Sequence, residues 1–221
     1  MNYSWRRFRE CLKKCQDPYT YEYMVSQLCF YLTLEEAGKL KIYYGDESGF
    51  SLEPSISYGW QPSKEYIRIT PVGGHRLNVF GLLSKDNDLH AYSVEKTIDT
   101  DTVIACIDDF VQTITQKTVI VLDNASVHRS EKFNAKLEEW IGKGLRIFHL
   151  PPYSPHLNLI ETLWRKSKYD WLKPRDYDSW EKLKEAIENI MKSVGNEYKI
   201  DFGELKHFTE YKKGKASIIK G

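Results

Sequence analysis

The strongest constraint on the fold is the stretch KTVIVLDNASVHRS, which begins at Lys117. Five consecutive apolar or β-branched residues, Thr118 to Leu122, end abruptly at Asp123. A run without polar alternation is typical of a strand that is buried on both faces. Such a strand requires covering helices on either side. The stretch therefore predicts a central strand of an α/β sheet.

Helix and strand patterns surround this run, and start and stop signals bound several of them. Glycines are expected to end the first helix and the first strand, and serines to begin two later helices. This order predicts a mixed sheet covered by helices on both faces. The expected helices lie within residues 3–37, 99–116, 130–141, from about 158, and 179–194; the expected strands lie within 40–49, 56–70, 75–85, 117–123 and 145–150.

Length and charge limit the class of protein. A chain of 221 residues with 41% hydrophobic content can bury one sizeable core and an appendage. The formal net charge of +1 argues neither for nor against nucleic acid. Basic residues gather at 1–15, at 164–175 and beyond Lys206, either as solvated faces or as nucleic-acid contacts. With no apolar run long enough for a membrane span and no signal-peptide core at the start, we expect a soluble cytoplasmic protein that acts without a membrane.

The four cysteines show no paired metal-ligand spacing. Cys11 and Cys15 could share one helix face as half of a zinc site, but no second pair lies nearby to complete it. We expect reduced thiols.

Three acids lie at positions where α/β sheets commonly bind ligands. Asp46 and Asp123 are expected at the ends of strands, whose carboxyl ends face a common crevice. Glu161 opens a helix after the proline-rich loop at 151–155, and proline rings restrict the conformations of that loop. Alternatively, the first two are ordinary strand-end acids and the third compensates a helix dipole. Glu47 is expected on the opposite strand face and is excluded from the site.

Three carboxylates without cysteine or paired histidine are the ligand set that suits Mg²⁺ or Mn²⁺. Two such ions per site would serve phosphoryl transfer. Arg165 and Lys168 share the helix face of Glu161, where they could hold DNA phosphates or simply pair with Glu161 and Asp170. Trp164 and Trp171 are interpreted as core residues rather than base-stacking ones.

The segments YYGDESGF, VIVLDNASVHRS and LPPYSPHLNLIETLWRKSKY resemble the three signature blocks of the DDE transposase domain in the mariner superfamily, in its bacterial insertion-sequence branch. The resemblance implies a ribonuclease-H-like fold with a five-stranded sheet, Mg²⁺ dependence, and cut-and-paste DNA transposition into TA sites. It assigns Asp46, Asp123 and Glu161 as the catalytic, metal-binding triad. It also matches Asn124 and His128 to the second block, where His128 either contacts DNA or steadies Asp123.

Relatives in this superfamily have two helix-turn-helix modules before the catalytic domain, whereas NYSWRRFRECLKK resembles only the end of the second. We therefore expect a helical linker at 1–38, a catalytic domain at 39–175, and a C-terminal helix with a basic tail at 176–221. The expected partners are transposon and target DNA and a second copy of the chain. Three origins stay open: one half of a transposase whose helix-turn-helix half is separately encoded and would be a further partner, a decayed copy, or an isolated domain. The alternatives are a regulatory remnant that only binds DNA or dimerises, and a nuclease that does not transpose.

Overall fold

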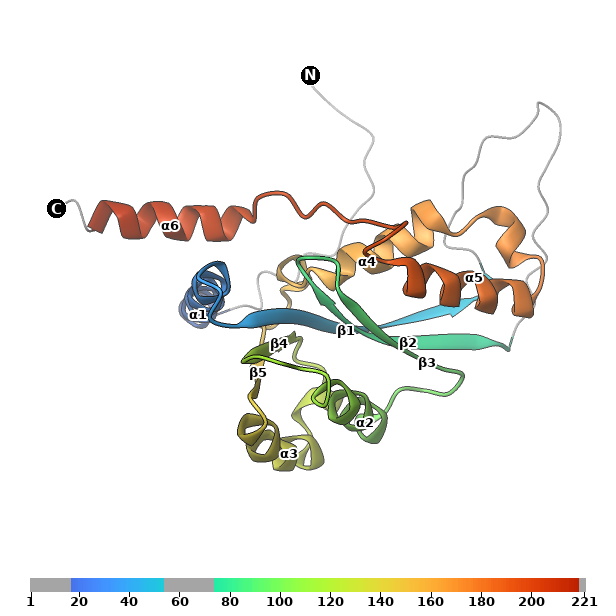
Figure 1. The fold of residues 1–221 in the computed structure, drawn as a ribbon, viewed down its shortest axis with the longest axis horizontal. Helices are drawn as coiled ribbons and strands as arrows, with labels where there is room; N and C mark the ends of the chain where they lie inside the picture. Colours follow the sequence, from blue (N-terminus) through green and yellow to red (C-terminus); the bar gives the residue numbers. More distant parts are fainter. Residues whose placement is uncertain (1–16, 54–73, 219–221) are drawn as a thin grey trace, which may run out of the picture.

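The computed structural model describes residues 17–53 and 74–218, with side chains described up to Lys213. Strands and helices alternate through the middle of the described chain (Figure 1). In order they are α1 (Pro18–Glu36), β1 (Lys41–Ser51), β2 (Arg76–Ser84), β3 (Leu89–Val94), α2 (Thr100–Phe110), β4 (Thr118–Leu122), α3 (Glu131–Gly142), β5 (Leu145–His149), α4 (Ile160–Lys166), α5 (Trp180–Ser193) and α6 (Lys206–Ile218).

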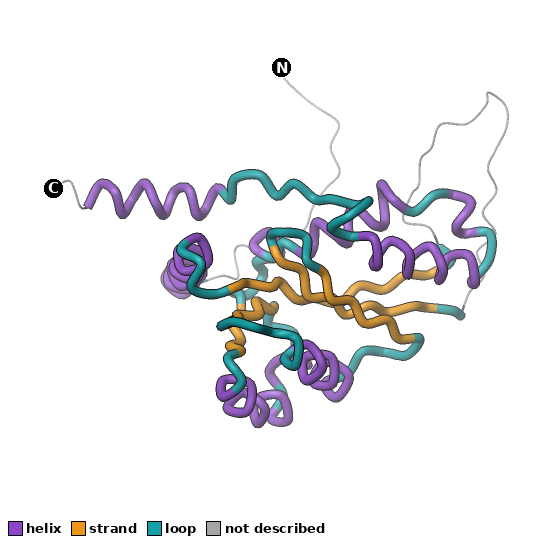
Figure 2. The backbone as a smooth tube through the Cα atoms, viewed as in Figure 1, coloured by secondary structure: helices purple, strands orange, loops and turns teal. Residues whose placement is uncertain are grey.

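The sheet is mixed, with strand order β3-β2-β1-β4-β5. β1 is antiparallel to β2, whereas β4 is parallel to both β1 and β5. Figures 1 and 2 show α2 and α3 on one face of the sheet and α4 and α5 on the other. The predicted mixed five-stranded sheet flanked by helices is therefore confirmed.

Strand β4 is buried along its whole length, as its apolar run predicts. Val119 and Val121 join the core on the side of α4 and α5, whereas Ile120 and Leu122 join the core on the side of α2 and α3. Because side chains alternate along a strand, a strand covered on both faces can be apolar at every position. The central position of β4, covered on both faces of the sheet, explains why it contains no charged residue.

Strand β1 alternates in the same way, and this decides which of its two acids reaches which face. Tyr44 packs in the core beneath α4 and α5, and Tyr43 packs on the side of α2 and α3. The register with β2 is continuous from Tyr43 to Ser51. Asp46 therefore lies on the α4 face and Glu47 on the α2 face.

The predicted helix starts agree with the structure. Asp99, Ser130 and Ser179 cap α2, α3 and α5, each accepting a hydrogen bond from a backbone N–H three residues on. Gly195 follows the last turn of α5 at φ 89°, a left-handed conformation that glycine adopts without strain. Local capping chemistry accounts for these boundaries.

Two boundaries and one whole strand differ from the prediction. Helix α2 ends at Phe110 instead of reaching 116, because Thr113 bonds the Phe110 carbonyl through both its N–H and its hydroxyl. Strand β1 continues past Gly49 to Ser51, where it pairs with Arg76. Strand β3 was not predicted at all, because it is a half-exposed edge strand with no clear alternation of burial. The strand expected at 56–70 lies outside the described residues.

Much of the basic tail, from Lys206 to Ile218, forms helix α6. Its Phe208 is buried, and Lys212 pairs with Glu36 of α1 at 2.7 Å. Figure 1 shows the far end of α6 extending away from the sheet. The contact with α1 explains why the segment is ordered at its start.

Cys29 and Cys106 are free and buried, whereas the candidate zinc pair, Cys11 and Cys15, lies outside the described residues. Across 17–53 and 74–218, every helix is too short or too polar to cross a membrane.

Candidate active site

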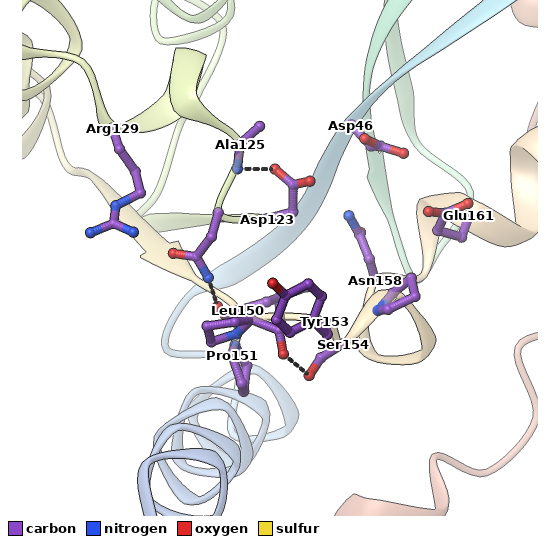
Figure 3. A pocket seen from close by; sticks show the side chains of 13 residues that line it. Asp46, Asp123, Ala125, Arg129, Leu150, Pro151, Tyr153, Ser154, Asn158 and Glu161 are labelled. Atoms are coloured by element: carbon purple, nitrogen blue, oxygen red, sulfur yellow. Dashed lines mark hydrogen bonds between the residues drawn. The ribbon is translucent and has the colours of Figure 1, made fainter. Parts of the chain in front are cut away.

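A pocket of about 480 Å³ opens at the end of β4. All three predicted acids line it, each from a different part of the chain: Asp46 from β1, Asp123 from the loop after β4, and Glu161 from the first turn of α4. Figure 3 shows the three side chains around this space. The remaining lining residues are Asn124, Ala125, Arg129, Leu150, Pro151, Pro152, Tyr153, Ser154, Pro155 and Asn158.

Asp46 lies in the middle of β1, not at its end as predicted. The parallel register with β4 includes Tyr44 opposite Val121, so two residues further along the strands Asp46 comes beside Asp123. Strand β1 is long because it continues to pair with β2 after β4 has ended. Asp46 and Asp123 come side by side because β4 ends at Leu122, whereas β1 continues to Ser51.

The Asp46 carboxyl is in a strongly perturbed environment. Burial, the negative charge of Glu161 and that of Glu47 raise its pKa to about 7. Oδ2 accepts a hydrogen bond from Trp164 Nε1 at 3.1 Å. Trp164 itself is buried in the core, as predicted. Burial is the largest cause of the raised pKa, and the charges of the neighbouring acids add to it.

This perturbation leads to a prediction about stability. Between about pH 4 and pH 7 the folded protein keeps a proton on Asp46 that the unfolded chain has released, so stability falls as pH rises through this range. With EDTA present, we expect Asp46→Asn to be more stable than wild type by about 1–3 kcal/mol at pH 8 and equal to it at pH 4. Urea unfolding at the two pH values measures this. Asp101→Asn at the exposed start of α2 is the control, and an equal gain in both variants would contradict the prediction.

Glu161 is positioned by the loop that precedes α4. Asn158 donates from Nδ2 to the Gly45 carbonyl at 3.1 Å and so fastens this loop to β1 beside Asp46. Partial burial raises the pKa of Glu161; Lys168 opposes this shift and Asp123 adds to it. Sequence reasoning overlooked Asn158, although its place between the prolines and Glu161 was a usable signal.

Asp123 is held from two sides. Its Oδ1 accepts hydrogen bonds from the Ala125 N–H at 2.9 Å and from His128 Nδ1 at 3.0 Å. The hydrogen bond from His128 is the main reason that the pKa of Asp123 is lowered. Asp123 therefore stays ionised where Asp46 resists ionisation.

The surroundings of His128 bear on its two expected roles, a DNA contact or support of Asp123. Its side chain is 0% exposed, and both ring nitrogens face carboxylates, Nδ1 toward Asp123 and Nε2 toward Glu47 at 3.0 Å. A ring in this position cannot reach a substrate. The structure instead supports the other interpretation, in which His128 steadies Asp123.

Of the other three residues predicted to bind nucleic acid, Asn124 lines the pocket, whereas Arg165 and Lys168 do not. Asn124 lines the pocket and donates to the Leu150 carbonyl, whereas Arg165 is exposed and does not line it. Lys168 is half-buried, with Nζ 5.2 Å from the centre of the Phe50 ring. Burial and the nearby Arg76 lower the pKa of Lys168, while Glu161 and Asp46 oppose this. Arg129 is a pocket cation that the sequence analysis did not select.

The pocket suits a hard divalent cation in its chemistry. In the described part of the chain, no three His, Cys, Asp or Glu side chains lie close enough together to form a ready-made metal site. The pocket lining nevertheless offers carboxylate oxygens and contains neither cysteine nor histidine. Asn158, which also lines the pocket, has a buried Oδ1 without a hydrogen-bond partner. Three acids without a soft ligand among them fit Mg²⁺ or Mn²⁺.

Comparisons with known proteins agree on the family. Residues 41–184 match the model of the DDE superfamily endonucleases. An uncharacterized 39 kDa protein of insertion element IS630 from Shigella sonnei is 24% identical over 194 residues, which cover 86% of this chain and 55% of that protein. The chain thus spans about half the length of this relative.

Solved structures of the Mos1 mariner transposase have the same fold. The Mos1 strand transfer complex has a TM-score of 0.63 at 13% identity, covering 98% of this chain and 66% of that one. The Mos1 paired end complex with Mg has a TM-score of 0.60 at 14% identity, covering 98% and 67%. These matches confirm the predicted ribonuclease-H-like fold. Because the family model spans well over half of the sequence, from the first residue of β1 into α5, the chain belongs to the DDE superfamily endonucleases.

Proposed function

We propose that this chain is the catalytic domain of a transposase, which cuts DNA and joins the cut strand to a new site with the help of Mg²⁺ or Mn²⁺. One observation supports this above all: Asp46, Asp123 and Glu161, which are far apart in the sequence, line one pocket of a DDE-family fold. The Mos1 neighbours, described as a strand transfer complex and a complex with Mg, support the same reaction class.

In this proposal Asp46, Asp123 and Glu161 hold the cations, two per site. When bound, the ions would activate the attacking oxygen and stabilise the leaving oxygen of an in-line displacement. The chain's own groups would bind and orient the DNA strand. Arg129, exposed at the pocket, and Lys168, beside Glu161, are placed to contact phosphates on either side.

The finer expectations stay part of the proposal. They are cut-and-paste transposition into TA sites, a homodimer in the DNA complex, and the domain boundaries at residues 38 and 175. The N-terminal residues that resemble the end of a helix-turn-helix region lie outside the described part of the chain. The aromatic helix α1 is the proposed dimer surface, because its Tyr19, Tyr23 and Phe30 are exposed.

A cleavage and joining assay tests the proposal. Labelled duplexes taken from both flanks of the gene would be incubated with the protein, a plasmid target, and Mg²⁺, Mn²⁺ or EDTA. We expect cleavage only with a divalent ion, followed by labelled products joined to the plasmid. Cleavage without joining would favour a non-transposing nuclease, and Mn²⁺ binding without cleavage would favour a regulatory remnant.

A further inference from the structure

Glu47 is connected to the pocket although it does not line it. Its Oε1 lies 3.0 Å from His128 Nε2, and His128 Nδ1 lies 3.0 Å from Asp123 Oδ1. The three residues form a continuous chain of hydrogen bonds, here called the Glu47–His128–Asp123 chain. It starts on the α2 face of the sheet and ends at the pocket.

The geometry of the Glu47–His128–Asp123 chain places a hydrogen-bond acceptor at each ring nitrogen of His128. A carboxylate can only accept hydrogen bonds, so an imidazole placed between two carboxylates must donate from both nitrogens. The ring is fully buried, and a buried cation without partners would be strongly unfavourable.

The Glu47–His128–Asp123 chain also determines how Asp123 orients its carboxylate. Oδ1 already accepts from Ala125 N–H and from His128, so it has two donors. Figure 3 shows the other oxygen of Asp123 on the side of Asp46. One oxygen is therefore held by the protein, and the second is left toward the pocket.

We propose that Glu47 is a positioning residue of the active site: it anchors His128, which in turn orients Asp123 so that one carboxylate oxygen stays available to a divalent cation. This inference rests on the proposed function, because it assigns Asp123 to the cation. It gives Glu47 a role that its position on the opposite strand face had excluded. Outer partners of this kind orient the groups that bind a metal, and their loss weakens metal affinity.

Calorimetric titration with Mn²⁺ tests this without depending on DNA cleavage. We expect Glu47→Ala to weaken Mn²⁺ binding about 10- to 100-fold. Glu47→Gln should stay within about threefold of wild type, because its amide oxygen can still accept from His128. The matched control is Asp88→Ala, which removes an acid that bonds Lys41 and Tyr43 on another part of the sheet and should lower stability without changing Mn²⁺ affinity.

The outcomes separate the inference from the function beneath it. If wild type and Glu47→Ala bind Mn²⁺ equally, Glu47 only supports the fold and the inference is wrong. If wild type itself does not bind Mn²⁺, the proposed function fails as well. If Glu47→Ala does not fold, Glu47→Gln still decides the question. A loss of Mn²⁺ affinity well beyond threefold in Glu47→Gln would overturn the inference, because its amide oxygen can still accept from His128.

Discussion

Asp123→Asn should reduce divalent-ion-dependent DNA cleavage by a factor of about 10³ or more. The substitution keeps the shape of the side chain but removes the negative charge that a cation requires. Ala125 N–H and His128 can still donate to the amide oxygen, so the local backbone should keep its conformation. The result would be a folded protein that has lost its chemistry.

The measurement is the initial rate of nicking of supercoiled plasmid in Mn²⁺, with thermal melting of the same samples. Asp101→Asn is the matched control. Asp101 forms an exposed ion pair with Lys132, and it does not line the pocket. It should cleave at the wild-type rate. Cleavage by Asp123→Asn within tenfold of wild type would remove Asp123 from the catalytic set.

Gly81→Val should both destabilise the protein and weaken its metal site. Gly81 lies opposite Asp46 in the sheet. A Cβ atom there would lie 2.9 Å from Ile160 Cδ1 and from Trp164 Cη2, too close for either to remain in place. Both side chains belong to α4, so we expect the helix to shift and to disturb Glu161 and the hydrogen bond from Trp164 to Asp46.

Overpacking of this kind typically costs about 1–3 kcal/mol of unfolding free energy, and we expect a loss in the upper part of that range. Mn²⁺ affinity should fall more than about tenfold, because misplaced ligating groups bind less well. Gly142→Val is the control, since a Cβ at that position meets nothing within 4 Å. Urea unfolding and calorimetry measure the two effects. Unchanged Mn²⁺ affinity in a destabilised Gly81→Val would show that α4 does not position the site.

Local chemistry explains why much of the fold could be predicted from the sequence. The apolar run of β4 can only be satisfied in the centre of a covered sheet, and the capping serines at 130 and 179 begin their helices through contacts with residues three positions away. Strand β3 shows the limit of this approach. It is a half-exposed edge strand, so its side chains have no sharp pattern to read.

The acids of the site were predictable by type and order, whereas their arrangement was not. Asp46 was expected at a strand end, but pairing with β2 carries β1 onward to Ser51. His128 was expected either to contact DNA or to steady Asp123, and it is buried between Asp123 and Glu47. The extension of β1 and the contact of His128 with Glu47 both depend on residues far apart in the sequence.

Thus the sequence by itself determined the α/β class, the central strand, the helix starts, and the three acids that line the pocket. Only the tertiary structure decided that Glu47, 81 positions from His128, takes part in holding Asp123. Periodicity reports which face a side chain occupies, since it depends on local backbone geometry. Which distant group meets that side chain depends on how strands pair and helices pack, and these are interactions between residues far apart in the chain.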